Sequence, residues 1–121
     1  MKVFVVEDAP QTCQELIELL AATEGLELVG QAGSVREALA GLEATAPEAV
    51  TLDISLPDGS GVEVLKHIRR CGWELCVVVL TANPYEALRA KCLQLGAAAV
   101  LDKLDGLDQA PQALLTCRKK L

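Results

Sequence analysis

Four short apolar runs in this chain are each followed by polar side chains that carry chemistry. The runs are residues 3–6, 49–52, 77–80 and 98–101, and the side chains that follow them are, in the same order, Glu7 with Asp8, Asp53, Thr81 and Lys103. Short apolar runs separated by helical patterns are typical of strands in a parallel sheet. Ligands of such sheets bind at the carboxyl ends of the strands. We therefore expect three carboxylates, a hydroxyl and an ammonium group to meet in one crevice.

The segments between the runs have the periodicity and the start signals of helices. The predicted helix starts are Pro10, Ser34, Ser60, Asn83 and Asp108. A glutamate three residues after each of the two serines gives the spacing of a capping box. At Asn83 a cap residue precedes a proline, which is favoured at the first helical position. The sequence thus predicts a helix after every strand.

A fifth strand, around residues 26–29, alternates apolar and polar residues, which indicates the edge of a sheet. Gly25, Gly72 and Gly96 are expected where helices turn back into strands. Five strand–helix units with right-handed crossovers predict a doubly wound α/β fold with three layers.

Composition excludes several classes of protein. The 121 residues suit one domain, and the net charge of -6 argues against direct binding of nucleic acid. No apolar stretch is long enough to span a membrane, so we expect a cytoplasmic protein. The cysteines are odd in number and form no C-x-x-C pair, which favours reduced, buried thiols: Cys13, Cys71, Cys76, Cys92 and Cys117.

The expected crevice has the chemistry of a phosphoryl-transfer site. Glu7, Asp8 and Asp53 would repel one another unless a cation lay between them, and an all-oxygen site beside a phosphate suits Mg²⁺. Asp53 is the candidate nucleophile, because a carboxylate can attack phosphorus to give an aspartyl phosphate. Lys103 and Thr81 are candidates to contact the phosphoryl oxygens.

At these residues the chain resembles the receiver domain of two-component response regulators. The resemblance spans nearly the whole length, so residues 1–121 are interpreted as a single receiver domain, with any output domain outside them. The matching motifs are Glu7-Asp8, residues 53–61, Thr81-Ala82, and Gly96-Ala97 ahead of Lys103. Residues 28–30, 34–42 and 53–65 are similar to regulators with a LuxR/NarL-type DNA-binding domain. The resemblance implies a flavodoxin-like sheet with strand order 2-1-3-4-5.

The resemblance also implies a function and its partners. A sensor histidine kinase would donate a phosphoryl group to Asp53 with Mg²⁺ bound, and the backbone carbonyl of Ser55 would be a further metal ligand. Ser55 and Asn83 match positions that tune the lifetime of the phosphoryl group. Phosphorylation would switch the surface formed by the fourth helix, fifth strand and fifth helix, and would control a transcriptional output domain or a receiver homodimer. Such a chain catalyses only its own phosphorylation and dephosphorylation and is not otherwise an enzyme.

Three residues depart from the family pattern. Val100 stands where an aromatic residue usually couples to the threonine, so we expect a modest conformational shift on activation. Leu104 replaces a proline that follows the lysine in a cis peptide, and this predicts either a trans bond with a shifted loop or a strained cis bond. Glu7 replaces the commoner aspartate, and its longer side chain would reach the metal through water.

Alternative functions are open to a chain of this kind. A pseudo-receiver would keep the fold and act as an interaction module without phosphate, which Val100 and Leu104 favour. An aspartate-based phosphatase would need a second aspartate at position 55, where this chain has serine. A flavodoxin would need a neutral phosphate loop after the first strand, and Glu7 with Asp8 would repel the phosphate. The complete acidic, hydroxyl and lysine set favours the phosphoacceptor.

His67 is expected at the surface, and Tyr85 is a candidate partner contact.

Overall fold

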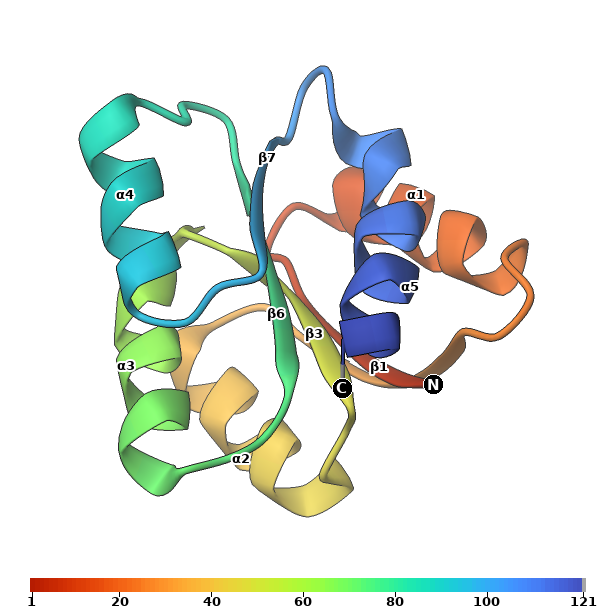
Figure 1. Ribbon diagram of the computed structural model, residues 1–121, viewed down its shortest axis with the longest axis horizontal. Coiled ribbons are helices and arrows are strands. Elements are labelled where there is room, and N and C mark those ends of the chain that lie inside the picture. Colours follow the sequence, from red (N-terminus) through yellow and green to blue (C-terminus); the bar gives the residue numbers. More distant parts are fainter. Residues whose placement is uncertain (121) are drawn as a thin grey trace.

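The computed structural model describes the backbone of residues 1–120 and the side chains of residues 1–117, and it has a central sheet between two layers of helices (Figure 1). The five strands of this sheet are all parallel and lie in the order β2-β1-β3-β6-β7, which confirms the predicted order 2-1-3-4-5. Their bounds are β1 (Lys2–Val6), β2 (Glu27–Ala32), β3 (Ala49–Asp53), β6 (Cys76–Thr81) and β7 (Ala99–Asp102). A small antiparallel hairpin, β4 (Ser55–Leu56) with β5 (Gly59–Ser60), follows β3.

The helices cover both faces of the sheet. Helices α1 (Pro10–Ala21) and α5 (Ala110–Lys120) pack on one face, and α2 (Val35–Thr45), α3 (Gly61–Cys71) and α4 (Glu86–Gln94) pack on the other (Figure 1). A short 3-10 turn, η1 (Leu107–Gln109), precedes α5. The sheet therefore separates two hydrophobic cores, as a doubly wound α/β fold requires.

The burial of the strands matches their sequence patterns. Strands β3 and β6 are buried along their whole length, and β1 is buried after Lys2, because each has neighbours on both sides and helices on both faces. Strand β2 is mostly half-buried and lies at the edge, as its alternating pattern predicts. The ends of the three buried strands are thus fixed by the core.

The predicted helix starts at Pro10, Ser34 and Ser60 are confirmed, whereas α5 begins at Ala110, two residues after Asp108, which lies in η1. Pro10 begins α1, and the Ser34 hydroxyl accepts a hydrogen bond from the Glu37 N–H at the start of α2. The prediction for α4 is wrong, because this helix begins at Glu86 and not at Asn83. The Asn83 carbonyl accepts a hydrogen bond from the Tyr85 N–H, so these residues form a turn ahead of the helix.

The expectation that all five cysteines are reduced is also wrong. Cys76, at the start of β6, forms a disulfide with Cys117 in α5, with their Cα atoms 6.2 Å apart. The two residues are 41 positions apart, so only the packing of α5 against β6 brings them together. Cys13, Cys71 and Cys92 are free thiols, but of these three only Cys92 is buried: Cys13 is half-buried and Cys71 is exposed, so the expected burial is wrong for Cys71.

The backbone settles two further expectations. Among residues 1–120 there is no cis peptide bond, so Lys103 and Leu104 are joined in the trans form. Gly25, Gly72 and Gly96 have positive φ angles of 95°, 67° and 105°, as expected where helices turn back into strands. Across the part of the chain that the structure describes, every helix is too short or too polar to cross a membrane.

Candidate functional site

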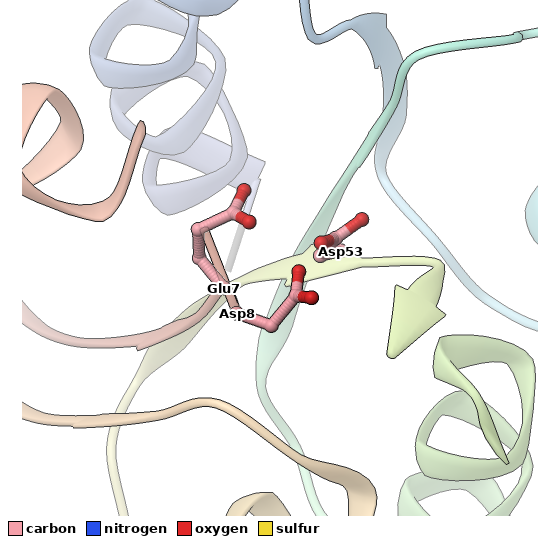
Figure 2. Close-up of side chains that lie close together, drawn as sticks. All are labelled: Glu7, Asp8 and Asp53. Atoms are coloured by element: carbon pink, nitrogen blue, oxygen red, sulfur yellow. The ribbon is translucent and has the colours of Figure 1, made fainter. Parts of the chain in front are cut away.

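Three carboxylates gather at the carboxyl ends of β1 and β3. Glu7 and Asp8 follow β1, Asp53 ends β3, and one oxygen from each lies within 4.8 Å of the others (Figure 2). The two strands are neighbours in register, with Val6 paired to Leu52, so the sheet itself brings these side chains together. Glu7 and Asp53 are 4% and 2% exposed, whereas Asp8 is open to solvent. The predicted acidic cluster is therefore present, with two members buried.

Lys103 joins two of these carboxylates. Its Nζ atom lies 2.9 Å from both carboxylate oxygens of Glu7 and 3.1 Å from Asp53 Oδ2, and it donates hydrogen bonds to Glu7 Oε2 and Asp53 Oδ2. The sequence predicts Lys103 at this site but does not predict its contact with Glu7. The signal available was the glutamate in place of an aspartate, because the longer side chain reaches the ammonium group.

Burial and like charge weaken the acidity of Asp53. Desolvation and the nearby charge of Glu7 raise the Asp53 pKa to about 7, and the hydrogen bond from Lys103 offsets this only in part. Burial acts to lower the pKa of Lys103, but hydrogen bonds to Glu7 and Asp53 outweigh it, and the pKa is raised above its ordinary value. The lysine is thus positively charged at neutral pH, while Asp53 is poised to gain or lose a proton.

The donor set fits a hard divalent cation. Glu7 Oε2 accepts hydrogen bonds from Lys103 and from the Ala9 N–H, whereas the buried Oε1 accepts none from the described residues, despite its proximity to Lys103. Three carboxylates gather here with a single ammonium group, so the site has an excess of negative charge that Mg²⁺ or a similar cation would neutralise. Glu7, Asp8 and Asp53 could hold such an ion.

Thr81 lies at the end of β6, next to β3 in the sheet. The residue is 7% exposed, and its hydroxyl accepts a hydrogen bond of 3.3 Å from the Asn83 N–H. The Thr81 carbonyl accepts a hydrogen bond from the Lys103 N–H, so the ends of β6 and β7 are joined. The structure therefore places Thr81 and Lys103 on neighbouring strand ends, as the sequence predicts. Asn83 itself is exposed beside them.

The residues after Asp53 form a fixed turn. The Ser55 N–H donates to Asp53 Oδ1 at 3.2 Å, and the Gly61 N–H donates to the Ile54 carbonyl at 2.7 Å. A side chain at Gly61 would run into the Asp53 carbonyl oxygen, so a glycine is needed where α3 begins against the end of β3. Both bonds constrain the position of the Asp53 side chain.

Val100 is buried in β7 at 3% exposure, and its carbonyl accepts a hydrogen bond of 2.7 Å from Arg89 Nη1. This contact fastens α4 to β7 at the position where the family usually has an aromatic ring. This role of Arg89 is not predicted from the sequence, because no motif indicates it. Tyr85, just before α4, is 56% exposed, and His67 is half-buried, with its ring edge-on to Trp73.

Comparison with known proteins agrees with this geometry. The model of the response regulator receiver domain family matches residues 3–114. The DNA-binding transcriptional activator DevR/DosR of Mycobacterium tuberculosis is 33% identical over 111 residues, which are 91% of this chain and 51% of that protein. The response regulator GacA of Pseudomonas aeruginosa is 31% identical, over 94% of this chain and 53% of its own length. The chain thus spans about half the length of these curated relatives.

A solved structure shows the same fold. The signal receiver domain of the putative response regulator NarL from Mycobacterium tuberculosis superposes with a TM-score of 0.90 at 27% identity, covering 98% of this chain and 95% of that one. A protein-glutamate methylesterase/protein-glutamine glutaminase of Treponema denticola also matches, at 30% identity over 91% of this chain and 30% of its own length.

These relatives include transcription regulators of the LuxR/NarL group, to which the sequence around Asp53 is similar. The group consists of regulatory modules of two-component signalling and not of classical enzymes. A buried acidic cluster at the strand ends, a lysine that bridges it, and a family match over nearly the whole sequence lead to one conclusion: the chain belongs to the response regulator receiver domain family.

Proposed function

We propose that this chain is a phosphoacceptor receiver in which Asp53 accepts a phosphoryl group from a sensor histidine kinase. One observation carries the proposal. The Asp53 carboxylate is 2% exposed at the end of β3, hydrogen-bonded to Lys103 and grouped with the carboxylates of Glu7 and Asp8. Two buried carboxylates that share one lysine ammonium group have a high electrostatic cost, which is a reason to expect that the site serves a charged ligand.

The reaction requires the ionised form of Asp53. A carboxylate oxygen attacks the phosphorus atom of a phosphohistidine, the P–O bond forms, and the P–N bond breaks with its electron pair leaving on the imidazole. Lys103 would favour this attack, because its ammonium group stabilises the ionised carboxylate and the transferred phosphoryl oxygens. The Thr81 hydroxyl, at the end of the next strand, is the proposed second donor to the phosphoryl group.

Mg²⁺ is the proposed cofactor, held by Glu7, Asp8, Asp53 and the backbone carbonyl of Ser55. When bound, Mg²⁺ supplies positive charge that offsets the carboxylates and the phosphoryl oxygens. The pairing of Glu7 with Lys103 adds a second role for Glu7, which fixes the ammonium group 3.1 Å from Asp53. Ser55 and Asn83 remain the proposed residues that tune the lifetime of the phosphoryl group.

As the output, phosphorylation is proposed to shift the conformational equilibrium of the surface made by α4, β7 and α5. Thr81 and Lys103 lie at the ends of the strands that lead to this surface, and they share a backbone hydrogen bond. Because Val100 has no ring to reorient, we propose a shift smaller than in receivers with an aromatic residue there. The proposed target of this shift is a transcriptional output domain in the whole protein. The proposed assembly is a receiver homodimer, and the proposed location is the cytoplasm.

A pseudo-receiver that acts without phosphate is the second candidate. Val100 and the trans peptide before Leu104 favour it, because both depart from the usual phosphorylation machinery. The hydrogen bond between Lys103 and Asp53 favours the phosphoacceptor. Burying these two charged side chains is costly, and a module that binds no phosphate gains nothing from that cost.

Intact mass distinguishes the two functions. The protein is incubated with a small phosphodonor and Mg²⁺, beside Asp53→Ala, a metal-free sample, and Asp108→Ala as a control for an exposed aspartate. The phosphoacceptor predicts a gain of one phosphoryl group in the wild type and in Asp108→Ala alone. No gain under conditions that label another receiver would support the pseudo-receiver.

A further inference from the structure

The first turn of α2 is held by a side chain from a distant segment. Asp58 Oδ1 accepts a hydrogen bond of 2.7 Å from the Val35 N–H, and Asp58 Oδ2 accepts one of 3.1 Å from the Arg36 N–H. The third N–H of this turn, from Glu37, bonds to the Ser34 hydroxyl. A helix leaves these first N–H groups without partners of its own, and a carboxylate also suits the positive end of the helix dipole.

Asp58 lies at the tip of the β4–β5 hairpin that follows the proposed phosphoacceptor. In this hairpin Ser55 pairs with Ser60 and Leu56 pairs with Gly59. Leu56 is buried in the same core cluster as Val35, whereas Asp58 is exposed and its carboxylate binds the N–H groups at the start of α2. The two backbone hydrogen bonds lower the pKa of Asp58, so this carboxylate is ionised at neutral pH.

The base of the same hairpin orients Asp53. The Ser55 N–H donates to Asp53 Oδ1, while Asp53 Oδ2 accepts from Lys103. Each oxygen of the proposed nucleophile therefore has one partner, and one of these partners belongs to the hairpin. A shift of the hairpin would move the Ser55 N–H and release one oxygen of Asp53.

We infer that Asp58 is a positioning residue: by binding the first two N–H groups of α2, it holds the β4–β5 hairpin so that the Ser55 N–H fixes the orientation of the Asp53 carboxylate. The role in phosphorylation rests on the function proposed above, whereas the link from Asp58 to Asp53 is a property of the chain itself. Nucleophilic attack depends on alignment of the reacting atoms, so a small displacement is enough to slow it.

Two variants with a matched control test this role. Asp58→Ala removes both acceptors, Asp58→Asn keeps one, and Asp108→Asn changes an exposed aspartate at the start of another helix. With a small phosphodonor and saturating Mg²⁺, we expect phosphorylation to be about tenfold slower in Asp58→Ala, intermediate in Asp58→Asn, and unchanged in Asp108→Asn. Circular dichroism at the assay temperature ensures that folded molecules are compared. An unchanged rate in fully folded Asp58→Ala would overturn the inference.

A second measurement does not depend on phosphorylation. Amide exchange with water, followed by NMR in metal-free protein, should show lost protection at Val35, Arg36 and Ser55 in Asp58→Ala and no change in Asp108→Asn. If only Val35 and Arg36 lose protection, Asp58 merely caps α2 and the positioning role is refuted. If the wild type accepts no phosphoryl group, the proposed function fails, and the exchange at Ser55 alone decides whether Asp58 positions Asp53.

Discussion

At the scale of single residues, the site is a balance of charges. Two buried carboxylates, Glu7 and Asp53, share one ammonium group, so the cluster of these residues with Asp8 carries more negative than positive charge. Without a cation the least costly response is for one carboxyl group to take up a proton. Burial first, and then the nearby charge of Glu7, raise the pKa of Asp53 to about 7.

The raised pKa of Asp53 predicts how the free energy of unfolding depends on pH in metal-free protein. Asp53 has a pKa of about 7 when folded and an ordinary value of 3.8 when unfolded, so the folded state binds more protons between these pH values. The free energy of unfolding should therefore fall as pH rises from about 4 to about 7. Urea denaturation across this range, with chelator present, measures the slope.

Asp53→Asn provides the comparison for this slope. The amide keeps the shape of the side chain and does not titrate, so the decline in stability between pH 4 and 7 should be smaller than in the wild type. Asp108→Asn, a change of an exposed residue, should keep the wild-type slope. Equal slopes in the wild type and Asp53→Asn would show that Asp53 does not titrate as described.

At the scale of elements, α4 has the fewest buried residues of the five α-helices in the described part of the chain. Cys92 is its only fully buried residue among those described, and Tyr85 at its N-cap makes no side-chain capping bond. The bond from Arg89 to the Val100 carbonyl is thus a main link between this helix and β7. Such limited burial suits a helix whose conformational equilibrium is proposed to shift on activation.

Arg89→Met should loosen α4. The substitution keeps an unbranched apolar side chain but removes the donor, so we expect faster hydrogen exchange at residues 86–94. Lys91→Met changes an exposed cation on the same helix and should leave the exchange unchanged. Equal exchange in the wild type and Arg89→Met would mean that packing alone holds the helix.

The elements also show how far the sequence predicts the structure. The buried strands β1, β3 and β6 were predicted because a strand covered on both faces is continuously apolar, and their ends located Asp53 and Thr81. The start of α4 was misplaced because Asn83 has the local preference of a cap residue, while the backbone there forms a separate turn. Contacts between distant side chains, such as Lys103 with Glu7, leave no local pattern and required the structure.

At the scale of the whole molecule, the Cys76–Cys117 disulfide closes a loop that contains β6, α4, β7 and most of α5. By restricting the unfolded chain, a bridge over 41 positions should contribute about 4 kcal/mol to stability in the chain-entropy model. The bridge joins the two elements by a covalent bond at the end of the sheet opposite to the acidic site.

Removing the disulfide should lower the free energy of unfolding by up to about 4 kcal/mol. Cys117→Ser, or a reductant added to the wild type, removes the bond, and Cys71→Ser changes an exposed free thiol as the control. Urea denaturation should give a reduced midpoint for Cys117→Ser and an unchanged midpoint for Cys71→Ser. A wild-type midpoint that does not respond to reductant would contradict this contribution.

The central claim is that the whole fold presents Asp53, and no other acid of the cluster, as the phosphoacceptor. Borohydride reduces an acyl phosphate to an alcohol, so treatment after phosphorylation converts the modified aspartate to homoserine, which peptide mass mapping then locates. We predict homoserine at position 53 only, and only when Mg²⁺ and the phosphodonor were both present. Homoserine at position 8, the alcohol that is one methylene longer at position 7, or no reduced residue at any position while another receiver is labelled in parallel, would contradict the claim.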